Sequence, residues 1–139
     1  DVRESVSMTG NSGPYLQYSV VRAKKILEKV GVFESGDLTG ENVGFAGVLE
    51  GYKLSEFERR LVRKMGDYIE VMRGAIVEKA PYKICTYLYE LAQEFSRFYE
   101  KTPVAGSEFE RERAAIVLGY KNVMIDGLSI LGIEVPEEM

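Results

Sequence analysis

Apolar residues recur in this chain at alternating spacings of three and four positions, a pattern that favours helices over strands. One stripe follows Gly13 and comprises Leu16, Val20, Ala23, Leu27 and Val30. Pro14 suits the first helical position, because the N–H that proline lacks would have no partner there. Gly31 suits the left-handed residue that often follows a helix. The sequence therefore predicts a helix over residues 14–31.

Three more segments have the same periodicity. They predict helices over residues 55–79, with a break near Gly66, over residues 81–102 and over residues 107–131. Their starts are marked by Pro81 and by three pairs at capping-box spacing, Ser55 with Glu58, Asp67 with Glu70 and Ser107 with Glu110. The last segment has the broadest apolar face and is expected at the centre. We therefore expect an all-α helical bundle.

Two segments lack this periodicity. Residues 1–13 alternate weakly between apolar and polar residues and predict a short extended arm. Residues 32–53 contain five glycines without a sustained period and predict a Gly-rich loop or insertion. With 139 residues, the chain fits a single domain, which we place at residues 14–139.

The composition argues against catalysis by this chain. It has no histidine, which removes the commonest general base and metal ligand. Cys85 is the one cysteine, so no internal disulfide is possible, and its apolar context predicts a buried thiol. The Gly-rich stretch GENVGFAG lacks the Lys-Ser/Thr of a phosphate-binding loop. We expect no catalytic residue, no metal site and no cofactor in this chain.

Charge and hydropathy limit the possible partners. No apolar run approaches the ~20 residues that a membrane span needs, so no membrane association is expected. The net charge is −4, so any nucleic acid would have to bind a localised basic patch. One such row lies about 200° from the apolar stripe of the first helix and comprises Tyr18, Arg22, Lys25 and Lys29.

Tyrosines near this row suggest binding to unpaired bases. Tyr15, Tyr18 and Arg22 are related by i, i+3 and i+7, so they lie on one face of the predicted helix. Aromatic rings and guanidinium groups stack on splayed bases. Tyr99, which follows the apolar stripe of the third helix, is a second candidate. The alternative is that these tyrosines pack at the rim of the bundle with solvated hydroxyls.

Three blocks resemble the arginyl-tRNA synthetase family. GNSGPYLQYSVVRAKKIL resembles the junction between the catalytic domain and the C-terminal helical, DALR-type anticodon-binding domain. YLYELAQEFSRFYEKTPV and GLSILGIEVPEEM are similar to the family's Tyr-Leu-x-x-Leu-Ala block and to its Leu-Gly-Ile-x-x-Pro-Glu-x-Met end. The blocks occur in the family's order and together span nearly the whole chain.

The resemblance implies an anticodon-binding domain of a class I arginine–tRNA ligase. Its site residues would be Tyr15, Tyr18, Arg22, Tyr99 and Met139, with Met139 closing the pocket from the C-terminus. The His-Ile-Gly-His and Lys-Met-Ser-Lys types of signature are absent. The chain would then be a non-catalytic piece of a cytoplasmic, monomeric ligase whose upstream catalytic domain uses ATP with magnesium.

Two departures from the family pattern accompany the resemblance. Glu138 stands where the family usually has arginine, and residues 32–53 have no equivalent that we can place. Three other interpretations stay open at this point. They are a helical protein–protein interaction module, the related helical domain of another synthetase such as the cysteinyl enzyme, and a stand-alone enzyme.

Overall fold

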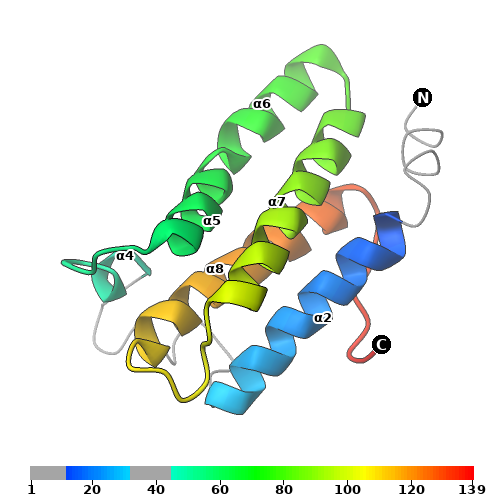
Figure 1. The fold of residues 1–139 in the computed structure, drawn as a ribbon. Coiled ribbons are helices and arrows are strands. Elements are labelled where there is room, and N and C mark those ends of the chain that lie inside the picture. Colours follow the sequence, from blue (N-terminus) through cyan, green and yellow to red (C-terminus); the bar gives the residue numbers. More distant parts are fainter. Residues whose placement is uncertain (1–11, 32–44) are drawn as a thin grey trace.

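The computed structural model of the chain describes residues 12–31 and 45–139 (Figure 1). Every regular element in these two ranges is a helix, which confirms the predicted all-α fold. The helices are α2 (Ser12–Val30), α4 (Phe45–Val48), α5 (Glu56–Gly66), α6 (Tyr68–Glu78), α7 (Tyr82–Lys101) and α8 (Glu110–Ile130). None of these helices is long and apolar enough to cross a membrane.

The four predicted segments correspond to α2, the α5–α6 pair, α7 and α8. The break predicted near Gly66 separates α5 from α6. The single-turn helix α4 lies inside the segment 32–53, which the sequence predicted as a loop, and its Val48 is buried. Residues 1–11 of the predicted arm and residues 32–44 of the predicted loop lie outside the described residues.

The capping predictions have mixed outcomes. The capping box of α5 is confirmed, because the Ser55 N–H donates to Glu58 Oε1 at 2.7 Å. Asp67 makes no side-chain cap, since its backbone is already helical (φ −79°, ψ −8°), whereas a capping residue is normally extended.

The cap predicted for α8 is also wrong. Glu110 accepts a hydrogen bond from the Gly106 N–H at 2.5 Å, and the helix begins only at Glu110. The segment 107–109 therefore forms turns rather than the first helical residues that the sequence predicted.

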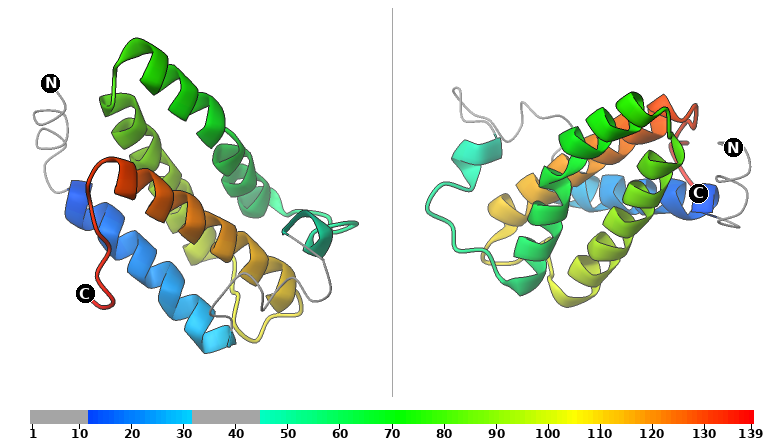
Figure 2. Two further views of the ribbon diagram at one scale, coloured as in Figure 1. Left: turned by 180° about the vertical axis from the view of Figure 1, so that it is seen from behind. Right: turned by 90° about the horizontal axis from the view of Figure 1, so that it is seen from above.

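Helix α7 lies between α2 and the α5–α6 pair, and α8 packs behind it (Figures 1 and 2). Helix α8 contacts α2, α4, α5 and α7, so its predicted central position is confirmed. Its buried residues are Ala114, Ala115, Ile116, Val117, Leu118, Tyr120, Met124, Gly127 and Leu128. Cys85 on α7 is free and buried, as predicted.

An aromatic stack and a hydrogen bond join the three long helices. The rings of Phe95 on α7 and Tyr120 on α8 are nearly parallel, with centroids 4.1 Å apart, and both residues are fully buried. The Tyr120 hydroxyl hydrogen-bonds the Ser19 hydroxyl of α2 at 2.5 Å, which satisfies both buried polar groups. Burial strongly raises the pKa of Tyr120, so the hydroxyl keeps its proton.

A buried ion pair joins α5 to α8. Glu58 is fully buried and accepts hydrogen bonds from the Tyr52 hydroxyl, the Ser55 N–H and Arg113 Nε, the last at 3.2 Å. Burial by itself would raise the pKa of Glu58, but these hydrogen bonds outweigh burial and hold the pKa below its usual value. Arg113 Nη1 also donates to the Pro103 carbonyl at 2.7 Å, so the same pair fixes the α7–α8 connection.

Replacing Glu58 should show how much the ion pair with Arg113 contributes to the free energy of unfolding and how this contribution depends on pH. We expect Glu58→Gln to lower the free energy of unfolding by about 2 kcal/mol near neutral pH, because Arg113 loses its charged partner. A carboxyl with a lowered folded-state pKa stabilises above its unfolded pKa and stops stabilising as pH falls through the folded pKa. The variant should therefore lose less stability than the parent on acidification in urea titrations. Glu100→Gln, at an exposed position, is the control, and equal acid sensitivity of parent and Glu58→Gln would contradict the account.

The contact between α7 and α8 depends on a glycine. A Cβ at Gly127 would lie 2.8 Å from Leu88 Cδ2 and 2.9 Å from Cδ1, and Leu88 is fully buried. We expect Gly127→Ala to lower the free energy of unfolding by about 1–3 kcal/mol through overpacking. A Cβ at Gly74 of α6 would meet nothing within 4 Å, so Gly74→Ala should instead stabilise by up to about 1 kcal/mol. Urea unfolding of both variants measures this contrast, and two changes of the same sign would refute it.

Candidate nucleic-acid interface

A groove of about 390 Å³ lies between α2 and the segment that connects α7 to α8. In Figure 1 these elements meet at the lower end of the bundle, below the middle of α7. Helix α2 contributes Tyr18, Val21, Arg22, Lys25, Ile26 and Lys29 to its lining. The opposite wall consists of Tyr99 at the end of α7 and residues 102–105 of the connection.

Arg22 lies between two tyrosine rings in this groove. Its guanidinium carbon is 4.2 Å from the centroid of the Tyr99 ring and 5.0 Å from that of the Tyr18 ring. Arg22 Nη2 also donates to the Tyr18 hydroxyl at 3.2 Å. Contacts of this kind between a guanidinium and an aromatic ring each stabilise by about 0.5–2 kcal/mol. The three side chains therefore hold one another in place before any ligand arrives.

The groove is positively charged although the chain has a net charge of −4. Arg22, Lys25 and Lys29 line it, and the described lining residues include no acid. The sequence placed these three cations in one row with Tyr18, and the structure confirms that the row shares a surface. Tyr18 is 45% exposed and Tyr99 is 44% exposed, so both rings offer area to a ligand.

The wall opposite α2 is held by buried groups. Thr102 and Val104 are buried, and the Thr102 N–H donates to the Phe98 carbonyl at 2.8 Å. The Pro103 carbonyl accepts from Arg113, whose position the buried Glu58 fixes. The connection is therefore attached to the end of α7 and to α8, which gives the groove a defined width.

Tyr15 faces a different neighbour from Tyr18. Its ring packs against the Tyr89 ring of α7, with centroids 5.4 Å apart, and its hydroxyl hydrogen-bonds the Ser96 hydroxyl at 3.3 Å. It lies between α2 and α7 and does not line the groove. The predicted proximity to Tyr18 along α2 holds, but Tyr15 is a partly buried packing residue in the structure.

Met139 also lies outside the lining of the groove. It is 52% exposed, and the end of the chain lies beside α2 in Figure 1. Gln17 Nε2 donates to the Glu134 carbonyl at 2.6 Å, so the C-terminal segment contacts α2 at the residue that precedes Tyr18 in the sequence. Of the five predicted site residues, the structure thus brings together Tyr18, Arg22 and Tyr99.

Sequence reasoning missed the second wall of the groove. Residues 102–105 follow the end of α7 and have no charge or aromatic ring that would have marked them. The sequence places Lys25 and Lys29 in one basic row with Tyr18, but it does not mark them as site residues; the structure shows that both line the groove. The part of the chain that the structure describes holds no cluster of three or more His, Cys, Asp or Glu side chains suited to a metal ion.

Comparison with known proteins gives a consistent result. The profile of the DALR anticodon binding domain matches residues 16–139. The chain is 35% identical to an arginine–tRNA ligase of Cutibacterium acnes, over 100% of this chain and 26% of that protein. It is 37% identical to an arginine–tRNA ligase of Thermococcus kodakarensis, over 96% of this chain and 21% of that protein.

A solved structure extends the comparison to the fold. The arginyl-tRNA synthetase of Thermus thermophilus superposes with a TM-score of 0.72 and 30% identity, over 91% of this chain and 21% of that one. The chain thus spans about a quarter of the length of the curated relatives it matches. The resemblance predicted from the three sequence blocks is confirmed, and the chain belongs to the DALR anticodon-binding domain family.

Proposed function

We propose that this chain binds the anticodon loop of arginine tRNA as the anticodon-recognition part of an arginine–tRNA ligase. The observation that carries the proposal is the Arg22 guanidinium held between the Tyr18 and Tyr99 rings in a basic groove. Membership of the family and similarity to arginine–tRNA ligases support it. They do not favour the alternative of a helical protein–protein interaction module.

The groove suits an unpaired base. Bases in RNA loops are splayed out, stacked on aromatic or guanidinium planes and read along their Watson–Crick edges. The exposed parts of the Tyr18 and Tyr99 side chains provide stacking area, since both residues are nearly half exposed. The in-plane N–H groups of Arg22 can donate to the O2 and N3 acceptors of a cytosine. Lys25 and Lys29 would neutralise neighbouring phosphates.

The middle base of the anticodon is the base that we assign to this groove. Arginine codons are CGN and AGR, so every arginine anticodon has cytosine in the middle, whereas its first and third positions vary. A protein that accepts all of them can use this cytosine as a fixed landmark. Tyr15 and Met139 stay predicted contacts, and either would reach the RNA outside the lining of the groove.

The remaining functions would belong to other parts of the ligase. In this proposal an upstream catalytic domain activates arginine with ATP and magnesium, and this chain supplies tRNA recognition without catalysis. The parent would act in the cytoplasm as a monomer.

Substitution of Tyr18 tests the proposal through a double-mutant cycle. Tyr18→Ala should weaken binding to a stem–loop RNA with an arginine anticodon by ~1–3 kcal/mol, the contribution of base stacking. Replacing the middle cytosine should weaken binding to the unsubstituted chain by at least a similar amount. Because both changes affect one contact network, the combined loss should be smaller than the sum. Fluorescence anisotropy at fixed salt measures the four combinations.

Tyr82→Ala is the matched control for this experiment. Tyr82 is 46% exposed, close to the 45% of Tyr18, but it lies at the start of α7 and does not line the groove. It should leave RNA affinity unchanged, and thermal melting should show that both variants fold. Full affinity in Tyr18→Ala, or indifference to the middle base, would leave Tyr18 as a solvated tyrosine at the rim of the bundle.

A further inference from the structure

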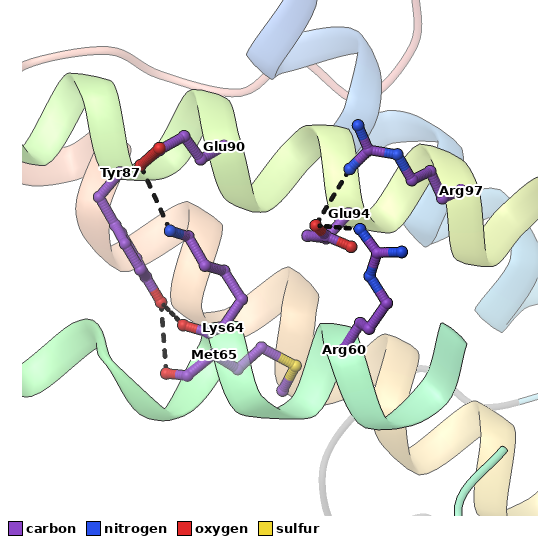
Figure 3. A network of polar contacts seen from close by, with 7 residues as sticks. All are labelled: Arg60, Lys64, Met65, Tyr87, Glu90, Glu94 and Arg97. Atoms are coloured by element: carbon purple, nitrogen blue, oxygen red, sulfur yellow. Dashed lines mark hydrogen bonds and ion pairs between the residues drawn. The ribbon is translucent and has the colours of Figure 1, made fainter. Parts of the chain in front are cut away.

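A second basic surface lies on the other flank of α7, between α7 and α5. Arg60 of α5 and Arg97 of α7 converge on one carboxylate (Figure 3). Arg60 Nη2 lies 3.2 Å and Arg97 Nη1 lies 3.0 Å from the same oxygen, Oε1 of Glu94. Two guanidinium groups therefore share a single carboxylate.

This arrangement leaves positive charge and free donors on the surface. One carboxylate balances one of the two guanidiniums, and the arginine side chains are 43% and 48% exposed, while that of Glu94 is 18% exposed. Among the described residues, the second oxygen of Glu94 has no hydrogen-bond partner and is buried. Glu94 thus holds Arg60 and Arg97 on a surface where both arginine side chains stay nearly half exposed.

Charged side chains of both signs extend this surface. Arg60, Arg63 and Lys64 line an open hollow of about 470 Å³ together with Asp67 and Glu94. Arg63 is exposed, and Lys64 lies 3.3 Å from Glu90 of α7.

Helix α5 is fixed against α7 at this point. The Tyr87 hydroxyl donates to the Lys64 carbonyl and lies 3.3 Å from that of Met65 (Figure 3). The arginine pair is therefore carried on two helices that are tied together.

The surface lies within reach of RNA bound in the groove. Arg97 and Tyr99 are two residues apart on α7 and so point about 200° apart around the helix. Tyr99 lines the groove beside α2, whereas Arg97 contacts Glu94, the carboxylate that also pairs with Arg60 of α5. A helix with its side chains is about 10–12 Å across, and even a fully stacked nucleic-acid strand advances about 3.4 Å per nucleotide along its axis. At most about three to four nucleotides are therefore needed to cross α7 from one flank to the other.

We propose that Arg60 and Arg97 bind a backbone phosphate of the RNA whose anticodon base occupies the groove, and that Glu94 positions the two guanidiniums. The proposal rests on the proposed function and adds a contact on the opposite flank of α7. Guanidinium groups match phosphate oxygens with paired, charge-assisted hydrogen bonds. Such a contact sets the register of the RNA and carries no information about base identity.

Salt dependence distinguishes this contact from the groove. In anisotropy titrations with the stem–loop RNA, the double variant Arg60→Gln/Arg97→Gln should bind about tenfold more weakly at low salt, as expected for the loss of a charge-assisted contact. Its slope of log affinity against log salt should fall by about one unit, because one phosphate is no longer neutralised. The loss should be the same whether the middle anticodon base is cytosine or another base.

Two further variants serve as controls. Arg73→Gln also breaks an ion pair, because Arg73 lies 2.9 Å from Glu70 on α6, away from the α5–α7 seam, and it should change neither affinity nor slope. Arg60→Lys/Arg97→Lys keeps both charges but loses the forked donors, so it should keep the slope and bind more weakly than the parent. This lysine variant also tests the proposal if the glutamine variant unfolds, which thermal melting would reveal.

The outcomes separate this inference from the proposed function. Unchanged affinity and slope in the folded glutamine double variant, with a loss in Tyr18→Ala, would overturn the phosphate contact and leave the function standing. A loss that depends on the middle base without a change in slope would also overturn it. Unchanged binding in both Tyr18→Ala and the double variant would contradict the function as well.

Discussion

The parallel stack of Phe95 on Tyr120 is the contact on which the rest of the structure depends. The two rings are fully buried and hold α7 against α8. The Tyr120 hydroxyl also hydrogen-bonds Ser19, which holds α2 against the same part of the core. Ser19 and Tyr18 are adjacent, so the bond that holds α2 in the core also sets where the Tyr18 ring emerges. Phe95 packs on Tyr99 as well, with centroids 6.4 Å apart. The core therefore determines the spacing of the two rings that enclose Arg22.

Arg22 lies between these two rings, and its side chain is ordered without a ligand. A solvated arginine samples many rotamers, and ordering it on binding costs free energy. Here its contacts with both rings, together with the hydrogen bond to Tyr18, restrict it in advance. The Glu94 carboxylate does the same for Arg60 and Arg97 on the other flank of α7. In the two proposals, a base would bind on the side of α7 that faces α2 and a phosphate on the side that carries Glu94, in a chain whose net charge would otherwise repel RNA.

The sequence predicted the helices well because each carries a complete apolar stripe, and periodicity reports local geometry. It predicted the Tyr18–Arg22 pair for the same reason, since both residues lie on one helix. It did not predict that Tyr15 would turn toward Tyr89 or that Met139 would lie outside the groove, because these depend on how separate helices pack. The cap predicted at Asp67 is wrong because the backbone there is already helical, and the cap predicted at Ser107 is wrong because residues 107–109 form turns before α8 begins. The pairing of Arg60 with Arg97 could not be predicted, since the two residues meet only across the α5–α7 contact.

An NMR titration of the labelled chain with a stem–loop RNA carrying an arginine anticodon tests the central claim most directly. The claim is that the middle cytosine enters the groove between α2 and the end of α7. It predicts nuclear Overhauser effects from the H5 and H6 protons of that cytosine to the ring protons of Tyr18 and Tyr99, with a shift of the Arg22 side-chain resonance. If the RNA instead perturbs another face of the bundle, while the resonances of these three residues stay unchanged at saturation, the account of the site is wrong.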